Sequence, residues 1–399
     1  MARMGAVELL AEPLELRCGA KLPHRIAKSA LSEQLGDRRN RPSAELVELY
    51  RTWARGGSGL LCTGNVMVDP AALGEPRNVA LPERPDAAEY RNWADAVSGT
   101  DAQLWVQLNH PGRQSPRFLS RQPVAPSAVP FETRGLRSVF APPRELTGDE
   151  IEAIIDRFAL AAMTFVEAGF GGVQLHGAHG YLISQFLSPL TNRRTDFWGE
   201  QRSRFLLEVV RAVRGAIGDS VPLSVKLNSA DFQRGGFTEE ESLAVVRELG
   251  EAGIDLLEVS GGTYERAAMM GMTRESTSRR EAYFLDYATK ARKVTDVALM
   301  VTGGFSTAEG MADAVRFGAL DVIGLGRPLT VTPDLVGRLL GGEEIGAERR
   351  CPKPGSSWRT AGWRSSGTRS KCTGSPPGSR WTCAGARSGR WCTPGSATR

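Results

Sequence analysis

Two of the four histidines of the chain, His176 and His179, are three residues apart, and Tyr181 follows them closely. Two imidazole N–H groups that converge on one oxygen stabilise the negative charge that develops on it during a reaction. A phenol beside them is a suitable proton donor. This stretch therefore predicts a site that polarises a carbonyl or anionic oxygen and supplies a proton.

A histidine pair also suits a metal ion, but no third ligand follows at a recognisable spacing, so we expect no metal here. Taken alone, a His-x-x-His pair on a loop is more often structural than catalytic. Position decides between the two interpretations, because a pair at the end of a barrel strand lies where such folds build their active sites.

Glycines follow two other apolar runs and indicate an anion site. Gly303 and Gly304 precede a predicted helix start at residues 306–309, and Gly326 and Arg327 repeat the arrangement with a guanidinium added. Free backbone N–H groups at a helix N-terminus attract anions, and arginine binds phosphate well. These glycines could be simple turn residues, but two such sites on successive loops favour a phosphate group.

Gln107 and Lys226 stand near the ends of two further apolar runs. A carboxamide can hydrogen-bond the amide edge of a pyrimidine ring, and a cation can balance negative charge on a reduced ring. Each residue alone is equally compatible with an ordinary polar position at the end of a strand.

Eight short apolar runs alternate with amphipathic stretches that carry helix-start signals, which predicts an α/β fold with parallel strands. The runs span residues 25–30, 59–63, 103–108, 171–176, 223–228, 255–260, 298–303 and 321–326. Capping boxes are expected at Thr147 with Glu150, at Thr238 with Glu241 and at Ser306 with Glu309. Eight is the strand number of the (β/α)8 TIM barrel, whose active sites lie at the C-terminal ends of the strands.

The rival architecture is a doubly wound open sheet, which has fewer strands and a glycine fingerprint after the first one. No such fingerprint follows residues 25–30. The long excursion over residues 109–144 is rich in Pro, Ser and Arg, and we expect it to be a loop that caps the barrel mouth. A final helix is expected at about residues 334–340.

The chain divides into a predicted barrel domain, residues 1–348, and a basic tail, residues 349–399. The formal net charge of +5 originates in the tail, because all 45 acidic residues precede it. The tail lacks apolar periodicity and is rich in Arg, Gly, Ser, Trp, Cys and Pro, so we expect it to be disordered. The abrupt change of composition suggests a frameshift near residues 348–354, and a natural basic tail is the alternative.

The body of the protein is acidic, so we expect neither a nucleic-acid nor a membrane partner. Only Cys18 and Cys62 precede the tail, which argues against a disulfide framework. The sequence has no apolar run of membrane-spanning length and no secretory signal pattern, and we interpret the protein as cytoplasmic. Whether it forms a homo-oligomer is left open.

The chain resembles the old yellow enzyme family of FMN-dependent NAD(P)H oxidoreductases over roughly residues 10–345. The resemblance is carried, in order, by HRIAKSALSE, GGSGLLCTGNVMVDP, VQLNHPGRQSP, HGAHGYLISQFLSPLTNRRTDFWGE, VKLNSADFQRGGFTEEES, EVSGGTYE, VTGGFS and GLGRPL. Such an ordered series of motifs is highly specific.

The resemblance implies a role for each matching position. FMN would be bound by Ser29, Ala30, Leu31, Ser32, Gly64, Asn65, Gln107, Lys226, Gly303, Gly304, Gly326 and Arg327. Ser32 stands where a Thr or Cys commonly tunes the flavin, and Lys226 where many members have Arg, which keeps the charge but loses the bidentate geometry. His176 and His179 would bind the substrate carbonyl, and Tyr181 would donate the proton.

The implied reaction is a ping-pong transfer in which NADH or NADPH reduces flavin N5, which then delivers hydride to the β-carbon of an α,β-unsaturated carbonyl compound. Competing interpretations are a frameshifted, catalytically impaired flavin-binding barrel, a 2,4-dienoyl-CoA reductase-like enzyme without its Fe–S and FAD parts, and nucleic-acid binding through the tail. A dihydrouridine synthase is disfavoured because its catalytic cysteine has no counterpart in the body. The identity of the alkene cannot be derived from the sequence.

Overall fold

The structure, a computed structural model, describes residues 5–132, 134–260, 284–305 and 307–343. Eight parallel strands within these ranges close into a ring, because β3 pairs with β13 on one side and with β4 on the other. The strands are β3 (Ile26–Lys28), β4 (Leu60–Met67), β6 (Gln103–Asn109), β9 (Gly172–Gly177), β10 (Leu223–Asn228), β11 (Leu256–Ser260), β12 (Ala298–Thr302) and β13 (Val322–Leu325). Each predicted apolar run overlaps one of them, so the predicted (β/α)8 TIM barrel is confirmed.

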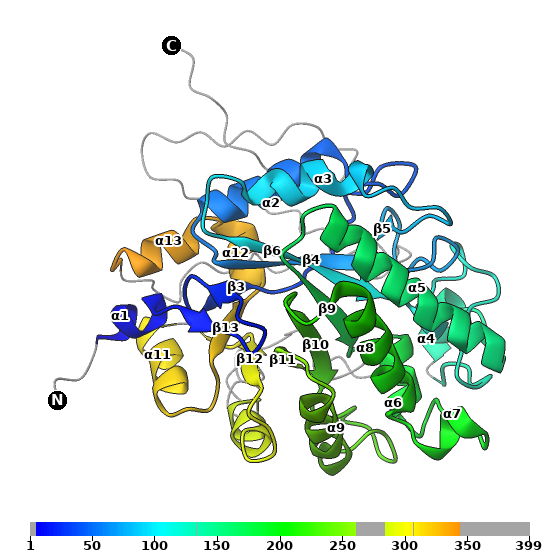
Figure 1. The fold of residues 1–399 in the computed structure, drawn as a ribbon. Coiled ribbons are helices and arrows are strands. Elements are labelled where there is room, and N and C mark those ends of the chain that lie inside the picture. Colours follow the sequence, from blue (N-terminus) through cyan, green and yellow to red (C-terminus); the bar gives the residue numbers. More distant parts are fainter. Residues whose placement is uncertain (1–4, 133, 261–283, 306, 344–399) are drawn as a thin grey trace. The chain divides into compact units, whose positions relative to one another are not determined.

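Helices surround the strands (Figure 1). They include α2 (Ala44–Arg55), α3 (Ala88–Ala94), α5 (Gly148–Glu167), α8 (Arg204–Ile217), α9 (Glu239–Glu251), α11 (Ala308–Arg316) and α13 (Leu335–Leu340), together with the helical residues 284–291. Shorter helices are α6 (Leu182–Leu187), α7 (Phe197–Glu200) and α12 (Arg327–Val331). The predicted final helix is confirmed as α13.

Two of the three predicted capping boxes are confirmed. Thr147 and Thr238 accept from the N–H groups of Glu150 and Glu241, and the two glutamates bond back to the cap residues. The third prediction was wrong, because α11 begins one residue later than expected. Its N-cap is Thr307, whose hydroxyl accepts from the N–H of Gly310 at 3.1 Å, whereas Ser306 lies outside the described residues.

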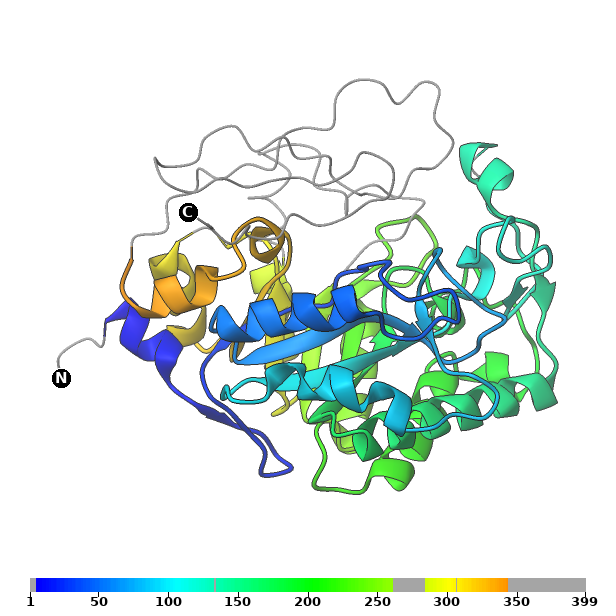
Figure 2. The ribbon, with the colours of Figure 1, turned by 90° about the horizontal axis from the view of Figure 1, so that it is seen from above.

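The excursion after β6 is more structured than a loop. It contains the 3-10 turn η2 (Gly112–Gln114), β7 (Val124–Ala125), α4 (Arg134–Val139) and β8 (Arg144–Glu145), and β7 pairs with β8 in parallel. Figures 1 and 2 place α4 at one side of the barrel. The predicted loop therefore contains short regular elements that the sequence did not indicate. Its first turn does contact the mouth, where Gln114 Nε2 donates to the carbonyl of His179 at 3.0 Å.

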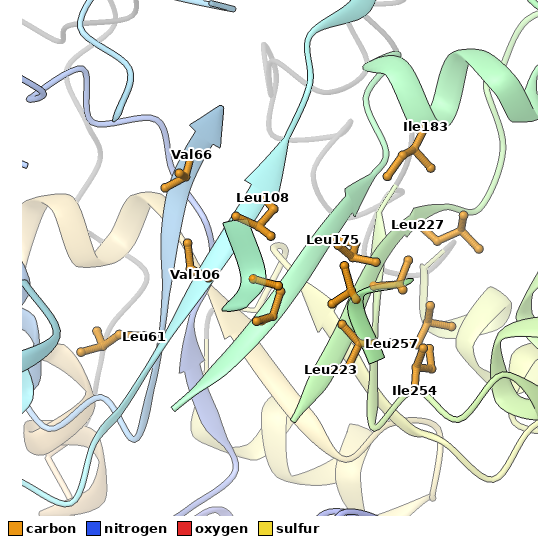
Figure 3. Close-up of a cluster of buried hydrophobic side chains, with 14 of the residues drawn as sticks. Leu61, Val66, Val106, Leu108, Leu175, Ile183, Leu223, Leu227, Ile254 and Leu257 are labelled. Carbon is orange, nitrogen blue, oxygen red and sulfur yellow. The ribbon is translucent and has the colours of Figure 1, made fainter. Parts of the chain in front are cut away.

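Successive side chains of each strand point alternately outward and inward, and this alternation separates two hydrophobic cores. The outward side chains pack between strands and helices, and Figure 3 shows this layer. Its labelled members are Leu61, Val66, Val106, Leu108, Leu175, Ile183, Leu223, Leu227, Ile254 and Leu257. Inward side chains near the N-terminal ends of the strands form a second, smaller cluster. It contains Ala27, Leu60, Trp105, Leu256, Met300 and Val322.

The second cluster continues into an N-terminal hairpin that no pattern in the sequence indicates. Its strands β1 (Leu14–Glu15) and β2 (Lys21–Leu22) pair antiparallel, and Leu16 and Leu22 pack on the inner apolar cluster. The short strand β5 (Val79–Ala80) extends the sheet beside β4, and the helix α1 (Ala6–Ala11) precedes the hairpin. The N-terminal end of the barrel is thus covered by apolar side chains, which leaves the C-terminal end for polar groups.

The chain divides into two units, Met1–Gly346 and Ala347–Arg399. The second unit lies outside the described residues, so the predicted domain boundary, the disordered character of the tail and its frameshift origin remain proposals. No helix among the described residues has both the length and the apolar character needed to cross a membrane.

Candidate active site

The inward side chains become polar toward the C-terminal ends of the barrel strands. Gln107 Nε2 donates to Gln174 Oε1 at 2.8 Å, and Lys226 Nζ lies 2.8 Å from a carboxylate oxygen of Glu258. The strict alternation of β10, LSVKLN, places Lys226 on the inside and its leucine and valine neighbours on the outside. The structure therefore brings the predicted Gln107 and Lys226 into one polar layer.

The end of β9 places His176 and His179 side by side, with ring centroids 4.9 Å apart. The N–H of Ala178 donates to Nδ1 of His176 at 3.2 Å, which assigns the ring proton of a neutral His176 to Nε2. His179 has a left-handed backbone with φ of +62°, and its N–H donates to Asn228 Oδ1 at 3.1 Å. Its Nε2 lies 2.6 Å from Ser260 Oγ.

Tyr181 follows at the N-cap of α6, and its ring centroid lies 4.8 Å from that of His176. Asn65 Nδ2 on β4 lies 3.5 Å from the phenolic oxygen. Two histidines and a phenol thus come together at the end of β9 and in the turn that follows it, and Asn65 of β4 faces the phenol. The predicted cluster is a spatial cluster as well as a sequence motif.

The surroundings of both histidines favour the neutral form because they oppose a positive charge. Burial is the largest cause that holds the pKa of His176 well below its usual range, and the charge of Lys226 adds to it. Burial, followed by repulsion from His176 and Lys226, likewise holds the pKa of His179 well below its usual range. A neutral imidazole donates one hydrogen bond and keeps its other nitrogen as an acceptor, which suits an oxygen that gains charge during a reaction.

The low pKa of His176 predicts a pH-dependent stability. As the pH falls, the unfolded chain binds a proton at His176 before the folded protein does. The free energy of unfolding is therefore constant with respect to this group above the unfolded pKa of about 6.5, and it decreases as the pH falls below that value. Between about pH 7.5 and about pH 5.5 we expect the wild type to lose up to about 1.4 kcal/mol more stability than His176→Gln. Urea unfolding at both pH values measures this difference, and parallel pH slopes would contradict it.

The segment after β3 is held by a buried ion pair. Lys28 Nζ lies 3.4 Å from Glu33 Oε1 and donates to the carbonyl of Cys62 at 2.8 Å. The same Glu33 oxygen accepts from the N–H of Gly64 at 3.0 Å. A side chain at Gly64 would collide with the Glu33 carboxylate and with the carbonyl of Leu31, so only glycine fits. Lys28 and Glu33 were missed from the sequence, although a lysine inside an apolar run was a usable signal.

The other predicted positions of this segment differ in exposure. Ser29 is buried, Ala30 and Leu31 are half-buried, and Ser32 is exposed. Ser32 Oγ donates to the carboxylate of Glu75, a partner that the sequence did not reveal. Burial raises the pKa of Glu75, which favours the protonated form of this carboxyl beside Ser32.

The ends of β12 and β13 carry the predicted glycines. Gly303 and Gly304 both have positive φ, at +94° and +95°, and no atom of the described residues lies within 4 Å of the position that a Cβ of Gly303 would take. Gly326 is buried at the end of β13, and Arg327 is exposed at the start of α12. Among the described residues, the space beside Gly303 is therefore open, and successive backbone N–H groups at such a turn can bind an anion.

One buried atom of the site lacks a partner within the described part of the chain. Asn65 Oδ1 has no hydrogen bond there, although buried polar atoms are nearly always paired. An unpaired acceptor beside Tyr181 fits a site that is completed by a ligand. Within the same residues, no three His, Cys, Asp or Glu side chains are grouped so that they could hold a metal ion.

A model of the NADH:flavin oxidoreductase / NADH oxidase family matches residues 9–344. The chain belongs to this family. It is 37% identical over 362 residues to the NADH-dependent flavin oxidoreductase iliE of Hypocrea jecorina, with 84% of this chain and 89% of that protein covered. It is 36% identical over 320 residues to the NADH oxidase of Thermoanaerobacter brockii, with 78% and 48% covered.

Solved structures agree with this membership. The complex of 2-naphthoyl-CoA reductase with 2-naphthoyl-CoA matches with a TM-score of 0.78 at 26% identity, over 84% of this chain and 53% of that one. The old yellow enzyme homologue of Zymomonas mobilis matches with a TM-score of 0.69 at 25% identity, over 84% and 93%. This chain thus spans about half of the first protein and nearly all of the second. The expected membership of the old yellow enzyme family is confirmed, and the protein is a flavin oxidoreductase.

Proposed function

We propose that this family member binds FMN and reduces the activated C=C bond of α,β-unsaturated carbonyl compounds with NADH or NADPH as the reductant. The observation that carries the proposal is the neutral His176–His179 pair beside Tyr181, at the same end of the barrel as the glycines of β12 and β13. Such a mouth has donors for a carbonyl oxygen and a proton source within one small space.

The chain offers a suitable group for each part of FMN. The phosphate would be held by Gly303, Gly304, Gly326 and Arg327, and the pyrimidine edge by Gln107 and Lys226. Two segments would border the flavin rings. They are Ser29, Ala30, Leu31 and Ser32 after β3, and Gly64 and Asn65 in β4. When bound, FMN supplies hydride exchange with the nicotinamide and with the alkene.

The catalytic side chains bind and protonate the substrate. His176, with its ring proton on Nε2, and His179 would hold the carbonyl oxygen and lower the cost of negative charge there. Tyr181 would give its proton to the α-carbon, and Asn65 would keep the phenol in place. The substrate is therefore a small molecule, and its carbonyl is the group recognised.

An anaerobic titration tests this function. The purified protein is expected to be yellow, to be bleached by NADH or NADPH, and to regain its colour when 2-cyclohexenone is added. Cyclohexanone should appear in an amount equal to the flavin reoxidised. A colourless protein that takes up no FMN, or a bleached protein that cyclohexenone leaves unchanged, would contradict the proposal.

Substitution of Gly303 tests the phosphate position. Gly303→Ala places a side chain in open space but on left-handed backbone, which costs roughly 1–2 kcal/mol. We expect weaker FMN binding in a fluorescence titration of the apoprotein. Gly19→Ala is a matched control, because Gly19 also has positive φ and open space but lies in the N-terminal hairpin. Equal FMN affinity in the Gly303 variant and the wild type would argue against the assigned position.

A further inference from the structure

Glu258 lies at the centre of the polar layer inside the barrel, and none of its side chain is exposed. One carboxylate oxygen, Oε1, lies 2.8 Å from Lys226 Nζ and accepts from Thr302 Oγ1 at 2.6 Å. The other oxygen, Oε2, accepts from Gln174 Nε2 at 3.0 Å. Both oxygens therefore face donors, as an ionised carboxylate requires in a buried position.

The contacts of Glu258 lead to three of the residues that would border the flavin. Lys226 is bound directly. Gln107 is bound through Gln174, because Gln174 Oε1 accepts from Gln107 Nε2 at 2.8 Å. Ser29 is bound through Thr302, whose oxygen lies 2.7 Å from Ser29 Oγ and whose own proton is given to Glu258.

These contacts also fix the orientation of the two amides. Gln174 must turn its NH2 group toward the Glu258 carboxylate, which turns its carbonyl oxygen toward Gln107. Gln107 then directs one amide hydrogen into the barrel. Its carbonyl oxygen and its second amide hydrogen are left for the donor and acceptor groups of a pyrimidine edge.

We propose that Glu258 is a positioning residue that sets the electron affinity of the bound flavin. It does so by orienting Gln107 and Lys226 and by compensating the charge of Lys226. The inference rests on the proposed function, since it takes Gln107 and Lys226 as the contacts of the flavin ring. It is independent of which alkene is reduced.

The electrostatic reason is the short distance between opposite charges in a buried place. A carboxylate 2.8 Å from Lys226 offsets much of the positive potential that the ammonium would exert on a bound flavin ring. Reduction adds negative charge to the ring, which an uncompensated cation stabilises. Glu258 therefore restrains the affinity for the reduced flavin and keeps it a stronger hydride donor.

The test replaces Glu258 with glutamine, which keeps the shape and removes the charge. In Glu258→Gln we expect the affinity for reduced FMN relative to oxidised FMN to increase at least tenfold, which corresponds to about 30 mV in the midpoint potential of a two-electron couple. The potential is measured by anaerobic reduction together with a reference dye, without any alkene.

Asp255→Asn is the matched control. Asp255 is also a buried carboxylate, and it pairs with Arg214 at 2.7 Å just before the first residue of β11, at the end of the strand opposite the mouth. We expect this variant to be less stable and to have an unchanged potential. If Asp255→Asn shifts the potential as much as Glu258→Gln does, the effect is not specific to Glu258 and the inference is wrong.

A double variant keeps the test decisive if the single change prevents folding. Lys226→Gln with Glu258→Gln removes both charges, and neutral replacement of a complete buried pair is usually tolerated. In this double variant we expect the affinity for reduced FMN relative to oxidised FMN to remain within about threefold of the wild-type value. The reason is that a compensated ion pair and a neutral pair have the same net charge. A tenfold change in the double variant, or no change in Glu258→Gln, would overturn the inference. A wild type that binds no FMN would instead overturn the proposed function.

Discussion

Tyr181→Phe is expected to slow the reduction of an unsaturated carbonyl compound by about 10²–10⁴-fold, the usual contribution of a positioned proton donor. The phenol lies beside the histidine pair, with ring centroids 4.8 Å apart for Tyr181 and His176. Reduction of the flavin by NAD(P)H needs no proton from this side chain. The rate of flavin reduction in Tyr181→Phe is therefore expected to stay within about twofold of the wild-type rate.

Stopped-flow absorbance separates the two half-reactions of this variant. The flavin bleach by NAD(P)H and its recovery with cyclohexenone are recorded independently, on enzyme with equal flavin content. Tyr90→Phe is a suitable control, since Tyr90 is a buried tyrosine that packs on Phe165 in the outer hydrophobic core. If Tyr181→Phe loses the same factor in both half-reactions, Tyr181 is not the specific proton donor.

His176→Ala is expected to lower kcat/KM for the unsaturated carbonyl compound by about 10²–10³-fold, as the loss of one oxyanion donor does in other enzymes. The same change should weaken the binding of phenols, because a phenolic oxygen would take the place of the proposed substrate carbonyl between the two imidazoles. His176→Asn retains an N–H donor and is expected to recover part of both losses.

Phenol titrations followed by the flavin spectrum measure this binding. The matched control is His24→Asn, because His24 is also buried but its ring bonds the carbonyl of Gly57 and the N–H of Ile26 at the start of β3. This control should alter stability and leave phenol affinity unchanged. Unchanged phenol affinity in His176→Ala would remove the assigned role of the histidine pair.

The barrel could be predicted from the sequence because its strands are short, apolar and separated by clear helix-start signals. The helix start after β12 was misplaced because Ser306 and Thr307 are both good N-caps, and only the hydrogen bond from Gly310 to Thr307 distinguishes them. The β7–β8 pair and the hairpin of β1 and β2 have two residues in each strand, which is too short for a period-2 pattern to be detected.

The site was predictable where chemistry is concentrated in one motif and not where it is spread over strands. His176, His179 and Tyr181 lie within six consecutive residues, at the end of β9 and in the turn after it, and they converge in the structure. Glu258 and Gln174 come from different strands, and their partnership depends on barrel register, which one sequence does not reveal. The glutamate inside the apolar run of β11 was nevertheless a visible signal, because a charge there must have a buried partner.

A crystal structure of the FMN-loaded protein with bound p-hydroxybenzaldehyde would locate all of these groups together. We expect the flavin phosphate against Gly303, Gly304 and Arg327, and the ring over Gln107 and Lys226. The phenolic oxygen should lie within hydrogen-bonding distance of His176 and His179. A phosphate bound elsewhere, or a phenol whose oxygen is remote from both imidazoles, would contradict the proposed site.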